Sequence, residues 1–562
     1  MMKKNDILKR LYTFIAALLF ANILSAQPAD VNLRSPFDFD ILLSASFGEL
    51  RSNHFHSGID FKTQGVVGKP IKCVADGYIC RARVQSGSYG LSLYVMHDGF
   101  MTLYAHLDRF PQEIAKRVRD NQYARERFEV DLYFTVDEYP VKRGDFLAYA
   151  GNTGYSFGPH LHYEVRNTSG ERIYNPLSFY KELVVDTRPP KAFALAVYPR
   201  VGSGAVGGDS FSRSYKVKNG VVSDTIDVWG DVAFGVDALD FMDNTSNKYG
   251  VYRVELFVDG ERCFVSQMDD FTFNEYKLIT ACVDRRREDA GEGSFQKMFI
   301  TDNNPFGQYS AGKSRGWVCI DSERLYNVEC RLTDYHGNSS SYALVLRGSR
   351  CAIPQAPLGK CLRWNVANRV EAPGVRLNIS RGEMYENALI EAVPFGNGCE
   401  LVGQGLVSGD DVAFWHGAKL SLSADSMPGV PKSKLCIVKV TEKDTSWVGG
   451  SYVDGWVTAK ISSLGRYELS ADTIPPVLKP INEVGWMTDA KILFSLADGE
   501  SSVSSFRGTL NGKFVLFGYN RKEKRLTLDL KQENIRRGDH RLKVVAVDAH
   551  GNRTVFEKNI KY

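Results

Sequence analysis

The chain has 562 residues, of which 43% are hydrophobic and 24% are charged, and its formal net charge is +4. At about 100–200 residues per domain, this length predicts three to five domains, each able to bury a core. The charge is spread thinly, and no Lys/Arg-dense patch carries interleaved aromatic residues. Composition therefore excludes nucleic acid as the expected partner.

A secretory signal peptide is predicted for residues 1–26. Lys3 and Lys4 precede the apolar run from Leu11 to Leu24, and Ala26 provides a small residue at the exit. The run is shorter than the roughly 20 residues of a spanning helix, and a membrane anchor is the alternative. No later segment is apolar for long enough to span a membrane. We therefore expect an exported protein of the periplasm or cell envelope, with secretion as an alternative.

The rest of the chain is predicted to be mainly β. Alternating and β-branched runs, separated by Gly, Asn and Asp, dominate from residue 40 to the end. A helix is expected at Pro111 to Arg127, which begins with proline and is heavily charged, and a shorter one near Pro176 to Glu182.

An internal repeat occupies two stretches of the C-terminal part. Both copies show, in one order, an Asp-Thr-x-Pro-Pro opening, a two-residue hairpin signal ending in Gly, and a strand running into Asp-x-His-Gly-Asn. The three markers begin at Asp186, Asp259 and Asp334 in the first copy and at Asp472, Asn511 and Asp548 in the second. Short alternating strands with regular turns favour a β-sandwich of the immunoglobulin-like (Ig-like) type for each copy.

These features divide the chain into five segments. They are the signal peptide (1–26), a first domain (27–185), an Ig-like sandwich with insertions (186–350), a β-rich domain of uncertain fold (351–470) and a second Ig-like sandwich (471–562). His336 and His550, in the closing motifs of the repeats, are interpreted as turn residues rather than metal ligands, since neither has a second His or Cys at ligand spacing.

The ten cysteines do not form the spacing of a zinc ribbon or a dense disulfide framework. Cys73 and Cys80 flank an Asp76-Gly77 turn and would face each other across a two-residue hairpin. A disulfide there is one interpretation, and two small buried residues are the favoured one.

Histidines concentrate in the first domain, where six of the ten fall between residues 54 and 162. His56 and Asp60 are four residues apart, and His160 and His162 are two apart. Because side chains at even spacing share one face of a strand, each pair can point into one cavity. Two imidazoles and a carboxylate form a normal zinc set, and three protein ligands leave a fourth position open, as in catalytic sites.

These residues resemble the two signature motifs of the lysostaphin/LytM-type metallopeptidases. The resemblance covers roughly residues 45–180 and extends to further segments in matching order. They are Tyr104 to Leu107, Val141 to Asp145, Gly151 to Gly154, Gly158 to His162 followed by Glu164 and Arg166, and Asn175-Pro176.

The resemblance implies a β-rich peptidase domain of the duplicated hybrid motif kind, with zinc held by His56, Asp60 and His162. His106 and His160 match the two histidines that are not ligands. One would act as the base and the other as a hydrogen-bond donor, in an order left open. The implied substrate is peptidoglycan peptide, with stem-peptide cross-links preferred over glycine bridges.

Other residues near the motifs are given lesser roles. Tyr104 could face the cavity together with His106, and His54 could face it together with His56, whereas His97 is interpreted as structural. About thirty residues, from Asp108 to Pro140, separate motifs that adjoin in the family. They are interpreted as a solvated excursion or, alternatively, as a wall or lid beside the cleft.

The expected function is thus zinc-dependent hydrolysis of peptide bonds in peptidoglycan. The alternatives are a catalytically silent scaffold that activates other wall hydrolases, or a wall-binding protein. The C-terminal β domains are expected to orient the enzyme on the wall or to bind a protein partner in the envelope.

Overall fold

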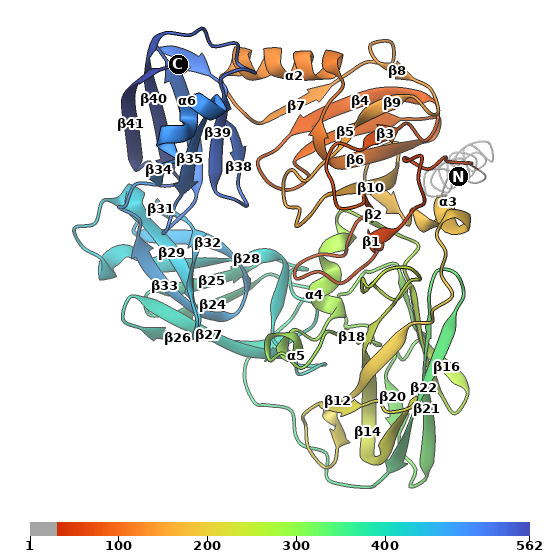
Figure 1. Ribbon diagram of the computed structural model, residues 1–562. Helices are drawn as coiled ribbons and strands as arrows, with labels where there is room; N and C mark the ends of the chain where they lie inside the picture. The colour runs from red at the N-terminus through yellow and green to blue at the C-terminus, as the bar shows by residue number, and fades with distance from the viewer. Residues whose placement is uncertain (1–30) are drawn as a thin grey trace, which may run out of the picture.

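The computed structural model describes residues 31–562 (Figure 1), so the predicted signal peptide lies outside the described residues. The fold is mainly β, as predicted, and its strands form six sheets within the described part. Among the same residues, no helix is long and apolar enough to cross a membrane. We refer below to the first (31–185), second (186–350), third (351–470) and fourth (471–562) regions.

The first region is built on an antiparallel sheet whose main path runs β1-β2-β10-β6-β5-β4-β7. Its strands are β1 (Leu43–Ala45), β2 (Ile59–Lys62), β3 (Pro70–Lys72), β4 (Gly77–Val84), β5 (Leu91–Met96), β6 (Phe100–Arg109), β7 (Val130–Tyr133), β8 (Pro140–Val141), β9 (Phe146–Ala150), β10 (His160–Asn167) and β11 (Arg172–Tyr174). In β10, Leu161, Tyr163 and Val165 enter the core. The alternate residues, including His162, therefore face the other side.

The predicted helix exists as α2 (Gln112–Arg125), within two residues of its expected bounds. Ile114, Val118 and Gln122 are its buried residues. The shorter helix is α3 (Leu177–Tyr180), continued by the 3-10 turn η1 (Lys181–Leu183).

The second region contains one ten-stranded sheet, because the 19-residue β14 pairs with β12 on one side and, in parallel, with β22 on the other. Its strands are β12 (Lys191–Val206), β13 (Arg213–Lys216), β14 (Val221–Leu239), β15 (Arg253–Val258), β16 (Glu261–Gln267), β18 (Phe295–Lys297), β19 (Tyr309–Ser310), β20 (Val318–Ile320), β21 (Leu325–Thr333) and β22 (Ser339–Gly348). The predicted hairpin at Asp259-Gly260 is confirmed, since it joins β15 to β16.

An insertion in the second region reaches the first. It contains β17 (Asp270–Thr272), η2 (Glu275–Leu278), α4 (Ile279–Cys282) and α5 (Arg285–Asp289). β17 pairs with β11, so a strand from the second region extends the sheet of the first.

The third region has two sheets around one core. One sheet contains β23 (Cys361–Leu362), β26 (Ala388–Phe395), β27 (Gly398–Gly405), β29 (Leu435–Val440), β30 (Thr445–Gly449) and β33 (Gly465–Ala471). The other contains β24 (Asn368–Ala372), β25 (Val375–Ile379), β28 (Ala413–Ser423), β31 (Ser451–Val453) and β32 (Trp456–Ser463). The 3-10 turns η3 (Ala424–Ser426) and η4 (Lys432–Lys434) lie between these strands.

The fourth region has two four-stranded sheets that share one core, the arrangement expected of a sandwich. The first contains β34 (Val477–Ile481), β35 (Lys491–Ala497), β38 (Gly518–Asn520) and β39 (Arg525–Asp529). The second contains β36 (Val503–Leu510), β37 (Lys513–Val515), β40 (Asp539–Asp548) and β41 (Arg553–Lys561). The turns η5 (Glu483–Gly485) and α6 (Trp486–Asp489) precede β35. The predicted Asn511-Gly512 hairpin joins β36 to β37 and is confirmed.

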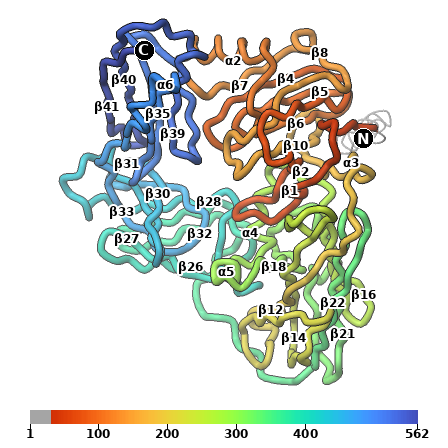
Figure 2. The backbone as a smooth tube through the Cα atoms, in the orientation of Figure 1, coloured from red at the N-terminus to blue at the C-terminus, as the bar shows by residue number. Residues whose placement is uncertain are grey.

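The four regions follow one another around a closed ring, in which the last region returns to the first beside α2 (Figures 1 and 2). Arg119 of α2 forms an ion pair with Glu533 at 2.6 Å, and Glu126 forms one with Arg507, also at 2.6 Å. The segment between Asp108 and Pro140 thus forms a contact between regions, which corrects its interpretation as a solvated excursion.

All ten cysteines are free thiols. Cys73 is buried, and the Cys80 thiol donates to the backbone oxygen of Tyr94. The two do not face each other across a hairpin, because β3 pairs with β9 while β4 pairs with β5 and β7.

Candidate metal centre

Two adjacent strands bring the three predicted ligands together. β2 and β10 are antiparallel neighbours, with Asp60 directly opposite His162. His56 lies just before β2, where its backbone N–H donates to Glu49 and its carbonyl accepts from Gly48. The two motifs are therefore separated by about a hundred residues in sequence but adjoin in the sheet.

The donor atoms of these residues converge closely. His56 Nε2 lies 3.1 Å from His162 Nδ1 and 3.3 Å from Asp60 Oδ1, and His162 Nδ1 lies 2.8 Å from the same oxygen. All three side chains are buried. Two nitrogens and a carboxylate oxygen within this spacing form a donor set suited to a metal ion.

The outer nitrogens of the two imidazoles are committed to other partners. His56 Nδ1 donates to the Ser46 carbonyl at 2.7 Å, and His162 Nε2 donates to Glu164 Oε1 at 2.8 Å. The inner nitrogens, His56 Nε2 and His162 Nδ1, consequently face each other with their lone pairs. A positive charge must lie between them, either a metal ion or an additional proton. The residues present therefore fit the metal that their pattern predicts.

Glu164 holds His162 in this orientation. It is fully buried, and it accepts hydrogen bonds from Ser57 Oγ and Tyr89 Oη, each at 2.7 Å. Although burial opposes ionisation, the Arg166 guanidinium and His162 lower the pKa of Glu164 to about 2. The carboxylate is therefore charged at neutral pH and strengthens His162 as a ligand.

The neighbouring carboxylates also change the pKa of His162. Burial disfavours its protonated form, but the hydrogen bonds to Asp60 and Glu164 raise its pKa to about 9. A metal ion entering this site displaces that proton, so metal affinity falls with acidity.

His106 and His160 lie beside the three ligands. The His106 ring is 4.8 Å from that of His160 and 5.9 Å from that of His162. His106 Nδ1 donates to the Thr153 carbonyl and His160 Nδ1 to the Gly158 carbonyl, both at 2.8 Å. Each therefore leaves Nε2 as a proton acceptor, and both residues line the cleft described below.

Burial keeps both of these imidazoles neutral. Burial first, and then the neighbouring His160 and His162, lower the pKa of His106 to about 3. Burial also lowers the pKa of His160. At neutral pH each can accept a proton.

Tyr104 does not share the cavity with His106, contrary to the expectation from alternation. Tyr104 is fully buried in the core, where its ring contacts Tyr163. His106 has φ of +57°, so the backbone turns at this residue and the imidazole leaves the face that regular alternation assigns to it. Such a conformation is uncommon for a residue with a side chain and is often found at functional sites.

The remaining histidines of the region have separate roles. His97 bonds the Asp76 carbonyl and Thr102 Oγ1, both at 2.8 Å, which agrees with its structural interpretation. His54 lines the cleft and contacts Asn53 Oδ1 at 2.6 Å, but no contact joins it to the three ligands.

The three ligands open into a cleft of about 1560 Å³. Its walls come from more than one region. Phe273 and Tyr276 of the second region line it, and Phe157, which is 93% exposed, lies at its margin. Lys522 of the fourth region places its ammonium 4.3 Å from the Phe157 ring centroid. The margin of the cleft therefore meets the fourth region.

Sequence reasoning missed the residues that support the ligands: Ser57, Tyr89, Thr153 and the roles of Glu164 and Arg166. One signal was available, because His162, Glu164 and Arg166 alternate on β10 and therefore share one face. The contacts with Ser57, Tyr89 and Thr153 join distant segments, and no local pattern indicates them.

Comparisons with known proteins find two kinds of similarity. Residues 359–472 match the model of the Zu5-like domain family. A 155-residue segment is 30% identical to an uncharacterized metalloprotease of Buchnera aphidicola subsp. Baizongia pistaciae, covering 26% of this chain and 34% of that protein. A 130-residue segment is 33% identical to DD-carboxypeptidase/endopeptidase Mpg of Neisseria meningitidis serogroup B, covering 23% of this chain and 24% of that one.

Among solved structures, the catalytic domain of lysostaphin from Staphylococcus simulans matches with 23% identity and a TM-score of 0.19, covering 25% of this chain and 92% of that domain. The chain thus spans about a third and about a quarter of the lengths of the two relatives above. The similarity concerns one domain rather than the whole protein.

Proposed function

We propose that this protein, whose N-terminal domain belongs to the lysostaphin/LytM-type metallopeptidases, is a zinc-dependent endopeptidase that hydrolyses peptide bonds in peptidoglycan. We place it outside the cytoplasm, in the cell envelope, because its substrate is found there and its first residues have the pattern of an export signal.

One observation carries this proposal. The inner nitrogens of His56 and His162 face each other at 3.1 Å beside Asp60, while both outer nitrogens donate to fixed acceptors. A scaffold protein would have no need for this orientation, because it costs buried polar contacts and serves only to present lone pairs to a cation.

The donor set favours zinc. Two imidazole nitrogens and one carboxylate oxygen suit this ion, and three protein ligands leave a position for water or substrate. When bound, zinc supplies Lewis-acid polarisation of the scissile carbonyl and activation of a water molecule.

The chain's own residues supply proton transfer and positioning. His106 Nε2 and His160 Nε2 can each accept a proton from water at neutral pH, and the protonated imidazole can then donate to the leaving amine. The second imidazole can donate to the oxyanion only in its protonated form, because its Nδ1–H already bonds a backbone carbonyl. His160 Nε2 lies 3.7 Å from Asp60 Oδ2, whereas no contact joins His106 to Asp60. This difference favours His106 as the more independent proton acceptor.

The cleft supports a peptide substrate. Its volume of about 1560 Å³ and its aromatic walls from two regions suit a substrate of peptide size. The Neisseria relative is named a DD-carboxypeptidase/endopeptidase, which supports stem-peptide cross-links over glycine bridges as the substrate.

Digestion of cross-linked peptidoglycan by residues 27–562 tests the proposal. Zinc is quantified first, and the products with and without chelator are identified by mass. We expect about one zinc per chain and chelator-sensitive peptide products that disappear in His162→Ala. Zinc binding without any wall product would reject peptidoglycan as the substrate. Absence of zinc from the native protein would instead favour the scaffold alternative.

A further inference from the structure

Three carboxylates, two of them buried and one partly exposed, meet where the third region joins the fourth. Asp472 opens the fourth region, Asp498 follows β35, and Asp548 ends β40. One ligand oxygen from each lies within 4.8 Å of the other two. Asp472 is 1% exposed and Asp548 is 2% exposed, so water does not screen their charges.

In each of these carboxylates, Oδ1 accepts hydrogen bonds from nearby residues, whereas Oδ2 has no hydrogen-bond partner. Asp472 Oδ1 accepts from Ile474 and Asn552, and Asp548 Oδ1 accepts from the backbone of His550 and Asn552. Asp498 Oδ1 accepts from the residues that follow it, at 2.5 and 3.0 Å. All three Oδ2 atoms are buried and have no hydrogen-bond partner. Three such oxygens at one point are unstable without a cation.

A related cluster, in which a histidine takes the place of one carboxylate, lies where the first region joins the second. Asp186, Asp334 and His336 converge in the same manner. His336 Nε2 bonds the Lys181 carbonyl at 3.1 Å, so Nδ1 presents a lone pair, and Nδ1 lies 3.8 Å from Asp186 Oδ2. Both of these atoms, and Asp240 Oδ1, are buried without a hydrogen-bond partner.

Strand register shows that the two clusters are equivalent. Lys191 of β12 pairs with Leu239 of β14, and Asp240 follows directly. Val477 of β34 pairs with Ala497 of β35, and Asp498 follows directly. Asp240 therefore occupies in the second region the place of Asp498 in the fourth. Burial, together with the neighbouring Asp186 and Asp334, raises the pKa of Asp240 to about 8.

We propose that each cluster binds one calcium-like divalent cation: one ion at Asp186, Asp334 and His336, with Asp240 as the carboxylate equivalent to Asp498, and a second at Asp472, Asp498 and Asp548. Carboxylate oxygens are the ligands of hard cations, and Ca²⁺ tolerates irregular geometry with water in the remaining positions. Mg²⁺ is less suitable, because it requires near-octahedral ligands and dehydrates reluctantly. These sites are separate from the zinc site and independent of the proposed peptidase activity.

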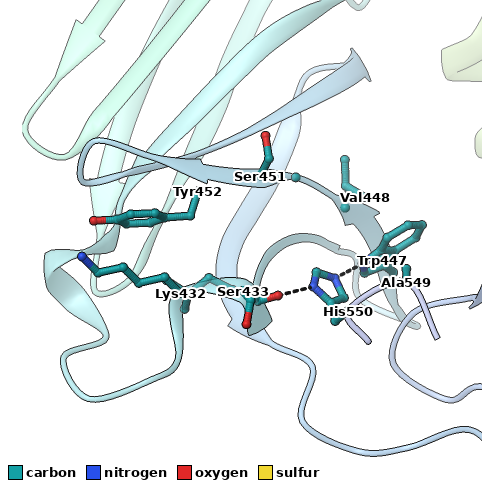
Figure 3. Close-up of a pocket in the computed structure, with 11 residues that line it drawn as sticks. Lys432, Ser433, Trp447, Val448, Ser451, Tyr452, Ala549 and His550 are labelled. Carbon is teal, nitrogen blue, oxygen red and sulfur yellow. Dashed lines mark hydrogen bonds between the residues drawn. The ribbon is translucent and has the colours of Figure 1, made fainter. Parts of the chain in front are cut away.

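Both ions would stabilise a junction between regions. In the first cluster, Asn338 Nδ2 donates to the Asp186 carbonyl, which links the closing loop to the connecting segment. In the second, Lys434 of the third region donates to the His550 carbonyl and to Asn552 Oδ1. Figure 3 shows His550 between Ser433 and Trp447 of the third region. The loop that follows Asp548 is therefore the contact surface, and the cation would hold that loop in place.

Direct counting of bound Ca²⁺ tests this proposal. The protein is stripped of divalent metals, given one equivalent of zinc, and dialysed against radioactive Ca²⁺ up to about 10 mM, above the weak affinities of extracellular calcium modules. The wild-type chain is expected to bind two Ca²⁺. Asp498→Asn and Asp240→Asn are each expected to bind one, and the double variant none. Asp489→Asn, an exposed residue of the fourth region, is the matched control and should bind two.

Thermal unfolding gives a second test, because the proposal predicts whether Asp498→Asn raises or lowers the unfolding temperature with and without Ca²⁺. Without Ca²⁺, Asp498→Asn relieves repulsion among carboxylates and should unfold at the same or a higher temperature than the wild type. With Ca²⁺, the wild type should gain stability and the variant should gain less. A purely structural carboxylate would lower the unfolding temperature in both conditions. The proposal is overturned if no Ca²⁺ binds, if both variants still bind two ions, or if equimolar Mg²⁺ displaces the Ca²⁺.

Discussion

At the scale of single residues, Glu164 sets how His162 binds a metal. The buried carboxylate accepts His162 Nε2–H at 2.8 Å, and Glu164→Gln would remove its charge while keeping its shape. We expect zinc affinity to fall by about 10–100-fold, as for other partners that orient a ligating histidine. Competition with a chromophoric chelator measures this change.

Glu171→Gln is the control for Glu164→Gln, because Glu171 is exposed and lies just after β10, the strand that carries Glu164. This variant should retain wild-type zinc affinity. Circular dichroism checks the fold, because the substitution also leaves the buried Arg166 without its ion pair. Unchanged zinc affinity in a folded Glu164→Gln variant would contradict the assigned role.

His106 and His160 are expected to act on protons and not on zinc. His106→Ala and His160→Ala should each lower kcat/KM by about 10²–10⁴-fold, the usual contribution of a positioned acid or base. Both variants should still contain one zinc per chain, unlike His162→Ala. Peptide hydrolysis and metal content are measured on the same samples.

His54→Ala is the matched control for these two substitutions, since His54 lines the same cleft without contacting the ligands. It should stay within a few-fold of the wild type. If zinc is lost from His106→Ala or His160→Ala, the affected residue belongs to the metal site and not to the proton-transfer pair.

The residues of the site were predictable to different degrees. Even spacing identified His56 with Asp60 and His160 with His162, because strand alternation is a local property. The same rule misplaced Tyr104, because the positive φ of His106 interrupts the alternation and nothing in the sequence marks it. The contact of Glu164 with Tyr89 depends on tertiary structure, which spacing cannot provide.

At the scale of elements, α2 shows that a helix can be predicted more easily than its contacts. Its proline start and charged composition indicated the helix within two residues, but its partner was not predictable. Arg119 pairs with Glu533, whose side chain is only 3% exposed, in a region about 400 residues away. Likewise the hairpin turns were predictable from Asp-Gly and Asn-Gly, whereas the pairing of β17 with β11 was not.

Arg119→Ala should destabilise the contact between α2 and the fourth region in a pH-dependent manner. Burial raises the pKa of the Glu533 carboxyl. The positive charge of Arg119 lowers this pKa and so offsets part of the rise. When the pKa of a carboxyl group is higher in the folded protein than in the unfolded chain, its contribution to stability is fully present at a pH below the unfolded-state pKa. This contribution is lost as the pH rises through the folded-state pKa. Without Arg119 the pKa of Glu533 rises further, so the substitution lowers the free energy of unfolding more at high pH than at low pH. We expect about 1–2 kcal/mol at pH 8 and less at pH 5.

Chemical denaturation at the two pH values measures this loss in Arg119→Ala. Arg117→Ala, exposed on the same helix, is the control and should change little. An equal loss at both pH values would mean that the guanidinium contributes packing and not charge compensation.

At the scale of the whole molecule, the ring is closed by polar contacts together with aromatic packing of Tyr123 and Phe128 against the fourth region. The fourth region reaches the first through Arg119, and also through the backbone of Arg521, whose N–H donates to the Ser86 carbonyl at 3.0 Å. The second and third regions meet at Lys297 and Asp410. Because each contact joins residues far apart in sequence, composition and periodicity could predict the regions but not the ring. The cleft margin formed by Phe157 and Lys522 exists only in the closed arrangement.

The Lys297–Asp410 pair offers a test of that arrangement. Lys297 Nζ lies 2.5 Å from Asp410 Oδ2, and the two side chains are 5% and 15% exposed. Burial disfavours the charged ammonium, but Asp410 and Asp284 raise the pKa of Lys297, so this ammonium is charged at neutral pH. Lys297→Met leaves Asp410 buried without its cation. We expect a loss of about 3–5 kcal/mol, measured by calorimetry, with the third region unfolding earlier.

Two further variants separate charge from packing at this junction. Lys297→Met combined with Asp410→Leu removes both charges and should recover much of the stability, because apolar replacement of a whole buried pair is often neutral or better. Lys313→Met, at an exposed position of the second region, is the control and should remain close to the wild type. If the double variant is as unstable as Lys297→Met, the junction depends on the lysine stem and its neighbours, and not on ion pairing. If it recovers, the ion pair serves mainly to select this one orientation of the third region against the second.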